Sequence, residues 1–404
     1  MTIAKSYKLL NFLNRDHSKL TRVIFGTLAF LGVFTVTRNI KLSLQVWRGI
    51  QRNDFKTSLR RCGWYAYNGW PGVKLIDDPY FDFTEGLSVP ELEIVSQFNQ
   101  RNKLRGETYR FFSNELYIAA AKIHFKLTDA DPEIYDLVEN FYVLANELVK
   151  EIDKMEIAQY QPLPIFPTFD QKFSANAKEA LEKFSNCFPI SEWRWYVISG
   201  TFLGLIREHG FLGHDIDIDL GINAEDFNFE NFLRIVSTST EFVMRKIDGQ
   251  IEISRNAENG FLFQKRICLI KLIHVSGINL DIFIHYKDGC MRWHGSTIHR
   301  WENKDFTLTP SILEGVKVLC PSDADTYLTE NYGDWRTPKY DFNCSTDTPN
   351  LVITRNFLSI AIFLKRLALQ MSTDQEQGLK FLNMLIKNRL IEQTDKGIRV
   401  RKFI

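Results

Sequence analysis

Residues 199–222 read SGTFLGLIREHGFLGHDIDIDLGI and place aspartates at three alternate positions, Asp215, Asp217 and Asp219, with isoleucines between them. In a β-strand successive side chains point to opposite faces, so this spacing predicts three carboxylates on one face and the isoleucines on the other. Neighbouring carboxylates repel one another and are costly to desolvate, and a hard divalent cation offsets both costs. The row therefore indicates a metal site, with a solvated edge strand as the alternative.

A glycine and a hydroxyl precede this row. Gly200 and Thr201 stand at the start of a helix predicted over residues 201–209. The free N–H groups of a helix N-terminus suit a phosphate, although Gly-Thr pairs also serve as ordinary helix caps. Arg207 follows in the same predicted helix, where it would hold a diphosphate or lie on a solvated face.

A third acid lies farther along the chain. Asp281 interrupts the apolar run INLDIFIHY, residues 278–286, which predicts a strand. An acidic group in such a run needs a metal or an ion-pair partner to justify its burial. The preceding predicted strand, residues 266–275, carries Lys271, with Lys265 just before it; these cations would face a phosphate or the solvent.

Taken together, these segments resemble the LicD/fukutin family of phosphosugar and phosphocholine transferases. The stretch GTFLGLIREHGFLGHDIDIDLGI is similar to the defining motif of that family, and the segment YLTENYGDWRTP at residues 327–338 resembles its closing element. The resemblance spans roughly residues 190–345 and is nearer to the fukutin branch than to the soluble bacterial enzymes.

The resemblance implies an α/β fold, a polymerase-β-like nucleotidyltransferase core with a mixed sheet. It implies that Asp217, Asp219 and Asp281 are the catalytic acids and hold Mg²⁺ or Mn²⁺. Further residues implied to bind the substrate are Gly200, Thr201, Arg207 and Asp215, the last as an accessory beside the DxD motif.

The function implied by the resemblance is glycan modification. Such an enzyme transfers a phosphoalcohol, ribitol-phosphate-like or phosphocholine-like, from a CDP-linked donor to a glycan or glycoprotein acceptor. A non-catalytic scaffold or escort for Golgi glycosyltransferases is the alternative. The chain has 50 basic and 49 acidic residues, a net charge of +1, which argues against a nucleic acid as partner.

The N-terminal region contains an apolar run. Residues 23–36 carry no charge and are bounded by Arg22 and Arg38. A helix between these arginines is only about 22 Å long, against about 30 Å of hydrocarbon, which snorkelling arginines would help to bridge. The run favours an uncleaved signal anchor over residues 23–37, with a signal peptide or a buried helix as alternatives. With the family resemblance, this predicts a single-pass type II protein of the Golgi or ER membrane with a lumenal catalytic domain.

The remaining pattern gives a domain plan. It predicts a cytoplasmic tail (1–22), the anchor (23–37), a stem and helical region (38–165), a catalytic domain (166–350) and C-terminal helices (351–404). Helical periodicity covers residues 89–157 and returns in residues 357–369 and 379–391. Within the catalytic domain, further helices are predicted over residues 176–184 and 227–235 and a strand over residues 193–199.

The cysteines and histidines leave several possibilities open. Six cysteines fit one to three disulfides in a lumenal enzyme. Cys290, His294, His299 and Cys320 form a loose set for which zinc, a disulfide and plain burial all stay open. Asn343-Cys-Ser is a glycosylation sequon.

Overall fold

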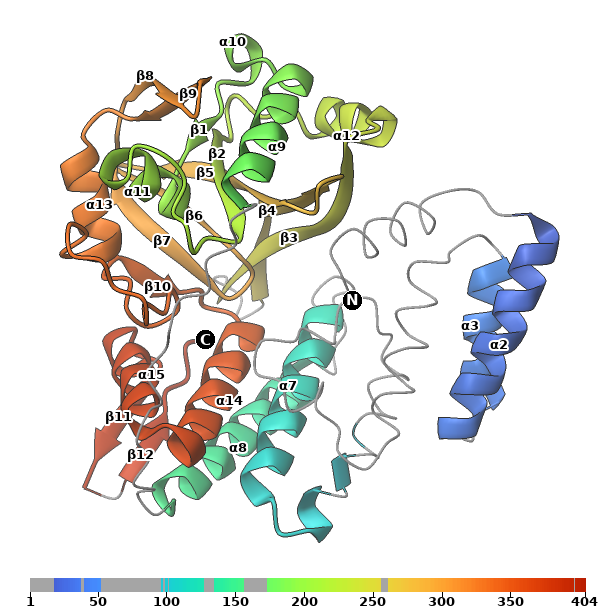
Figure 1. Cartoon of the computed structure of the whole chain (residues 1–404). Helices are drawn as coiled ribbons and strands as arrows, with labels where there is room; N and C mark the ends of the chain where they lie inside the picture. Colours follow the sequence, from blue (N-terminus) through green and yellow to red (C-terminus); the bar gives the residue numbers. More distant parts are fainter. Residues whose placement is uncertain are drawn as a thin grey trace. The chain divides into compact units, whose positions relative to one another are not determined.

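The computed structural model describes residues 18–37, 40–51, 96, 99–100, 102–126, 134–155, 173–255, 261–395 and 397–404. Most of the first half of the predicted stem and helical region, and its end at residues 156–165, lie outside these residues. The chain divides into two compact units (Figure 1). One contains the described residues 173–356, and the other contains the described residues up to 155 together with residues 357–404.

The first unit is a mixed α/β domain, as the sequence predicts. Its helices are α9 (Phe173–Cys187), α10 (Ile190–Trp193), α11 (Ser199–Arg207), α12 (Phe229–Thr238) and α13 (Ala324–Tyr332). Its strands are β1 (Tyr196–Val197), β2 (Asp217–Asn223), β3 (Phe242–Arg255), β4 (Phe261–His274), β5 (Asn279–Asp288), β6 (Met291–Gly295), β7 (His299–Lys304), β8 (Leu308–Leu313), β9 (Val316–Pro321) and β10 (Leu351–Ile353).

These strands form one ten-stranded sheet within the described residues. Its order is β10-β7-β6-β5-β2-β1-β9-β8, and β4 pairs with both β3 and β5. The β2–β5 and β1–β9 pairs are parallel, whereas β2 runs antiparallel to β1 and β5 runs antiparallel to β4 and β6. The sheet is therefore mixed, and β2 and β5 lie side by side at its centre.

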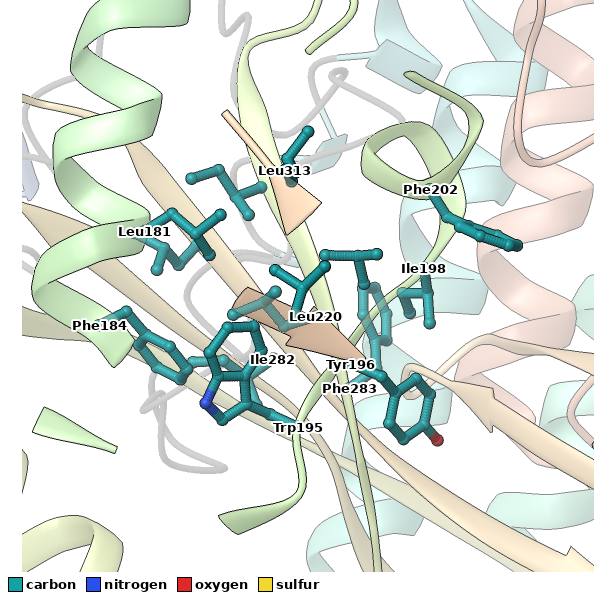
Figure 2. Packing of buried hydrophobic residues seen from close by; sticks show 14 of the residues in the cluster. Leu181, Phe184, Trp195, Tyr196, Ile198, Phe202, Leu220, Ile282, Phe283 and Leu313 are labelled. Carbon is teal, nitrogen blue, oxygen red and sulfur yellow. The ribbon is translucent and has the colours of Figure 1, made fainter. Parts of the chain in front are cut away.

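Alternation along β2 separates core from site. Ile218, Leu220 and Ile222 are fully buried, and each contributes roughly 1.5–3 kcal/mol through its burial. Figure 2 shows Leu220 packed among large side chains of the same cluster, including Phe184 of α9 and Trp195. The intervening positions of the strand, Asp217 and Asp219, are left to the other face.

The aspartate row differs from the prediction at its first position. β2 begins at Asp217, so Asp215 and Ile216 precede the strand in a loop where the backbone N–H of Asp215 donates to Leu212. Ile216 is 74% exposed, whereas Ile218 is buried. The prediction of three carboxylates along one strand is therefore wrong for Asp215, because the alternation of a strand starts only at Asp217.

The second unit contains the helices predicted outside the catalytic region. Its elements are α2 (Lys19–Thr37), α3 (Ile40–Gln51), α7 (Thr108–Lys126), α8 (Ile134–Asp153), α14 (Phe357–Thr373) and α15 (Gln375–Lys387), with a hairpin of β11 (Ile391–Thr394) and β12 (Gly397–Val400). α14 packs against α7, α8 and α15, for example through Phe357 and Phe141, whose ring centroids are 4.9 Å apart. The hairpin was not predicted.

The apolar N-terminal run lies in a helical pair. α2 packs against α3, where the side-chain amide of Gln51 donates to the Arg22 carbonyl over 2.8 Å. Across the described part of the chain, no helix combines the length and the apolar character needed to cross a membrane. The anchor predicted over residues 23–37 is therefore not supported.

Candidate metal and phosphate site

Three carboxylates from two neighbouring strands converge. Asp217 and Asp219 lie on β2 and Asp281 lies on β5, in a parallel register that places Asp219 opposite Asp281. One oxygen of each carboxylate lies within 4.8 Å of the others. Among the described residues, this is the one group of three or more histidine, cysteine or acidic side chains arranged closely enough to hold a metal ion. The structure thus brings together the three acids that the sequence assigns to a metal.

The start of α11 is fastened to this strand pair. The Gly200 N–H donates to Asp219 Oδ2 over 3.2 Å, and the Thr201 hydroxyl accepts from the Asp219 N–H over 2.8 Å. Ser199, the first residue of the helix, has a positive φ of 47°. Thr201 therefore acts on the backbone of β2, and the helix N-terminus lies against the carboxylate of Asp219.

Asp215 lies close to the same helix start. A β-carbon added to Gly200 would come within 2.8 Å of Asp215 Oδ2 and 3.6 Å of Asp219 Oδ2. Only a glycine at position 200 allows the carboxylates of Asp215 and Asp219 both to keep their present positions. The ring of the neighbouring His214 packs against the ring of Tyr340, with 5.4 Å between the ring centroids.

In this acid cluster, Asp215, Asp217 and Asp219 have raised pKa values, because they are buried close to one another. Burial, followed by the charges of Asp215 and Asp281, raises the pKa of Asp217 to about 7. Burial, followed by the charges of Asp217, Asp215 and Asp281, raises the pKa of Asp219 well above its ordinary value. Burial also raises the pKa of Asp215. A bound cation would reverse these effects.

One cation already contacts the cluster. Lys271 of β4 lies opposite Asp281 in the antiparallel β4–β5 register, and its Nζ forms an ion pair with Asp281 Oδ2. The other oxygen, Oδ1, is buried and has no hydrogen-bond partner. An unsatisfied buried oxygen beside two more carboxylates fits an all-oxygen site for Mg²⁺ or Mn²⁺.

Arg207 has other contacts. Its Nη1 donates to the Trp335 carbonyl over 3.1 Å, and its Nε donates to Glu208 over 2.9 Å. Arg207 therefore connects α11 to the segment at residues 327–338. Its predicted role on a diphosphate stays a prediction.

The cysteine and histidine set does not converge as a metal group in the described residues. His294 is buried and stacks between His285 and Trp301, with ring centroids 4.4 and 5.3 Å away. Cys290 is exposed, and the Cys320 thiol donates to the Thr309 carbonyl. Thiols are free at Cys187, Cys268, Cys290 and Cys320, so none of these four forms a predicted disulfide.

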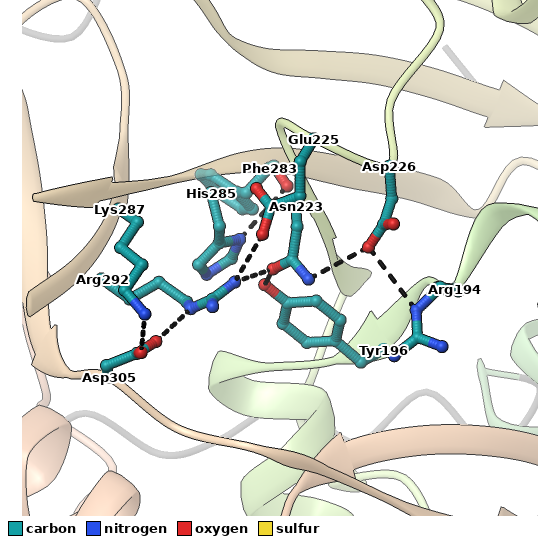
Figure 3. Close-up of polar contacts among 10 residues, drawn as sticks. All are labelled: Arg194, Tyr196, Asn223, Glu225, Asp226, Phe283, His285, Lys287, Arg292 and Asp305. Atoms are coloured by element: carbon teal, nitrogen blue, oxygen red, sulfur yellow. Dashed lines mark hydrogen bonds and ion pairs between the residues drawn. The ribbon is translucent and has the colours of Figure 1, made fainter.

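A second polar cluster on the same strands was not predicted from the sequence. The Asn223 network consists of Asn223, Tyr196, Arg292, His285 and Asp226 (Figure 3). Asn223 Oδ1 accepts from the Tyr196 hydroxyl at 2.9 Å and from Arg292, and its Nδ2 donates to Asp226 at 3.2 Å. The amide thus uses both its acceptor and its donor inside the domain.

The signal that identifies Lys271 is present in the sequence. The turn at Ser276-Gly277, where Gly277 has φ +94°, centres the β4–β5 hairpin and makes Lys271 and Asp281 opposite residues. The Asn223 network has no comparable signal, because Arg292 lies on a strand 69 residues away.

The region that holds this site matches a known protein family. Residues 192–323 match the family model described as LicD/FKTN/FKRP, nucleotidyltransferase domain. The matched range includes all of the predicted site residues and Lys271, and it ends before the segment at residues 327–338. The predicted resemblance to the LicD/fukutin family is confirmed over this range.

The chain is also similar to curated proteins. It is 25% identical over 188 residues to Ribitol-5-phosphate transferase FKTN of Mus musculus, and 24% identical over 188 residues to the protein of the same name of Homo sapiens. An uncharacterized protein of Caenorhabditis elegans is 30% identical over 139 residues, 33% of this chain and 32% of that protein. The alignments with the FKTN proteins cover 44% of this chain and 37% of their own length.

Proposed function

We propose that this chain is a metal-dependent transferase that moves a phosphoalcohol from a CDP-linked donor to a glycan acceptor in the lumen of the Golgi or ER. The transferred group is ribitol-phosphate-like or phosphocholine-like. The name of the FKTN relatives, ribitol-5-phosphate transferase, supports a ribitol-phosphate-like group.

The observation that carries the proposal is the convergence of Asp217, Asp219 and Asp281 within 4.8 Å at the N-terminus of a helix. Their mutual repulsion has no structural purpose, because apolar residues would fill the same strand positions at lower cost. Such an arrangement suits phosphoryl transfer, since a cation site beside a helix N-terminus stabilises phosphate charge.

The three acids would each offer an oxygen to Mg²⁺ or Mn²⁺. When bound, the ion would supply positive charge that offsets the negative charge developing on the phosphate during transfer. The protein itself fixes the relative positions of the acids through the β2–β5 register and the bonds from Gly200 and Thr201 to Asp219.

The bond changes are those of an in-line displacement. The acceptor hydroxyl oxygen forms a bond to the phosphorus that carries the alcohol, and the bond from that phosphorus to the bridging oxygen breaks. CMP leaves with the bridging oxygen. A carboxylate takes the hydroxyl proton, and Asp215 is the candidate beside the metal-binding acids because burial raises its pKa.

The test is release of CMP from a panel of CDP-alcohols by the purified full chain, with Mg²⁺, with Mn²⁺ and with EDTA. We expect turnover with at least one donor, loss of turnover in EDTA, and loss in the double variant Asp217→Asn, Asp219→Asn. Asp288→Asn, an exposed carboxylate on the same strand as Asp281, is the matched control.

Absence of turnover with every donor, together with full function of the double variant in cells that lack the native chain, would contradict the proposal. That result would favour the scaffold role, for which the acid cluster is dispensable.

A further inference from the structure

We infer that Lys271 couples metal binding to donor binding: it competes with the metal at Asp281 when the site holds no donor, and it contacts the diphosphate once the donor is bound. This inference rests on the proposed function. It assigns a specificity-determining role to a residue outside the aspartate motif.

The first step concerns the position of Lys271. β4 runs antiparallel to β5, and the register places Lys271 directly opposite Asp281. The ion pair uses Asp281 Oδ2 and leaves Oδ1 buried without a partner. Lys271 therefore occupies Oδ2 of Asp281, which is one of the three acids that could hold a metal ion.

The second step concerns charge. A divalent ion between the three acids would lie beside the ammonium group of Lys271, and like charges at such separations repel strongly inside a protein. Lys271 thus opposes a bare metal ion. A metal that arrives with a diphosphate brings negative charge to the same place, and the same ammonium then attracts the complex.

The third step concerns freedom of movement. The Lys271 side chain is 33% exposed, whereas that of Asp281 is 7% exposed. Four methylene groups separate the ammonium from the backbone, so it can leave Oδ2 and contact a neighbouring phosphate without any change in the strand. Asp281 has no such freedom, because its carboxylate is buried on the central strand.

The consequence is a reciprocal coupling. If the lysine weakens metal binding without a donor and strengthens donor binding with a metal, each ligand raises the affinity for the other. The site then accepts its metal together with the nucleotide and discriminates against free cations.

The experiment measures Mn²⁺ affinity from the free Mn²⁺ electron paramagnetic resonance signal, first without nucleotide and then with CDP as the probe. The full chain is compared with Lys271→Met and Lys271→Arg. Lys265→Met is the matched control, because it removes the same charge from an exposed position of the same strand. The double variant Asp217→Asn, Asp219→Asn supplies the background for Mn²⁺ bound to CDP in solution.

For Lys271→Met we expect two changes of opposite sign. Mn²⁺ alone binds about fivefold more tightly, because the competing ammonium is removed. CDP binds the Mn²⁺-loaded protein about tenfold more weakly, because a charge-assisted contact to phosphate is lost. Lys271→Arg and Lys265→Met retain the coupling of the native chain.

Two other outcomes would overturn the inference. If the ion pair is merely structural, Lys271→Met should bind both Mn²⁺ and CDP more weakly than the native chain. If Lys271 has no role at the site, both affinities should be unchanged. Failure of the proposed function gives a different result, namely no Mn²⁺ binding by the native chain above the background of the double variant. Urea unfolding of each variant establishes that the affinities refer to folded protein.

Discussion

The two polar clusters on β2 and β5 occupy the same pair of strands and the same face, four residues apart. At one end Asp219 lies opposite Asp281, and at the other Asn223 lies opposite His285. Each end has one buried atom without a hydrogen-bond partner, Asp281 Oδ1 at the first and His285 Nε2 at the second. The difference lies in charge, because Asn223 exchanges hydrogen bonds with Tyr196, Arg292 and Asp226, whereas the acid cluster holds three carboxylates and one lysine.

This difference separates a structural polar cluster from a functional one. A buried network of hydrogen bonds that leaves no excess charge stabilises one arrangement of the core and needs no ligand. A buried group of like charges is stable only with protons or a cation, so it indicates a site for a ligand. The criterion is the charge left over after the contacts are made, since burial and polarity are similar at both ends.

The largest contrast should come from one aspartate of the acid cluster and one aspartate that contacts the Asn223 network. Asp281→Asn removes a charge from the metal group and deprives Lys271 of its partner, so we expect CMP release to fall by about a hundredfold or more. Asp305 contacts the Asn223 network through Arg292 Nε at 2.9 Å and also pairs with Lys287. Asp305→Asn should keep its activity and lose about 0.5–1 kcal/mol of unfolding free energy.

Rates of CMP release and urea unfolding curves of both variants check this contrast. Equal losses of activity would show that the two clusters act as one catalytic unit. Full activity of Asp281→Asn would remove that acid from the site.

Much of the acid cluster could be predicted because its information is local. The spacing of Asp217 and Asp219 requires only the two-residue period of a strand, and Asp281 is conspicuous in an apolar run. Asp215 was placed on the strand because the same period continues through it in the sequence. The loop before Asp217 interrupts that period, and no residue in the loop indicates the interruption.

The outer strands of the sheet and their inner neighbours could not be predicted in the same way. β7, with the sequence HRWENK, carries five polar or charged side chains in six residues and has no apolar alternation. It is a strand because β6 and β10 pair with it on both sides. Such strands are specified by their neighbours, and their own residues show weak β propensity.

Alanine substitutions at Gly221 and Gly200 test the comparison of the two clusters, and we expect effects of intermediate size. At Gly221, an added β-carbon would lie 2.4 Å from Tyr196 Cε2 and 2.8 Å from His285 Cε1, two buried rings with no room to move. Gly221→Ala should therefore lower the unfolding free energy by about 1–3 kcal/mol. At Gly200 the nearest atom is Asp215 Oδ2, the end of a movable side chain, so Gly200→Ala should change stability less and Mn²⁺ affinity more.

Chemical denaturation and Mn²⁺ titration of both glycine variants distinguish the two ends of the strand. The comparison fails if Gly200→Ala is the more destabilising variant, or if Gly221→Ala alone alters Mn²⁺ affinity.

The smallest effect concerns pH, and two groups should give slopes of opposite sign: Asp217 of the acid cluster, and His294, which packs against His285 of the Asn223 network. Burial first, and then the charges of Asp215 and Asp281, raise the pKa of Asp217 from 3.8 to about 7. The native state therefore binds more protons than the unfolded state between those values, and its contribution to stability falls as pH rises. Burial lowers the pKa of His294 from 6.5 to about 3, so the native state binds fewer protons there and stability rises with pH.

In metal-free buffer these two contributions oppose each other between pH 4 and 6.5, each with a slope of at most about 1.4 kcal/mol per pH unit. Asp217→Asn should make the slope of unfolding free energy against pH more positive than that of the native chain. His294→Phe, which keeps a ring between His285 and Trp301, should make it more negative. Urea denaturation at several pH values measures both slopes. Parallel curves for all three proteins would mean that neither cluster changes its protonation on folding, and the excess charge that distinguishes the acid cluster would then be absent.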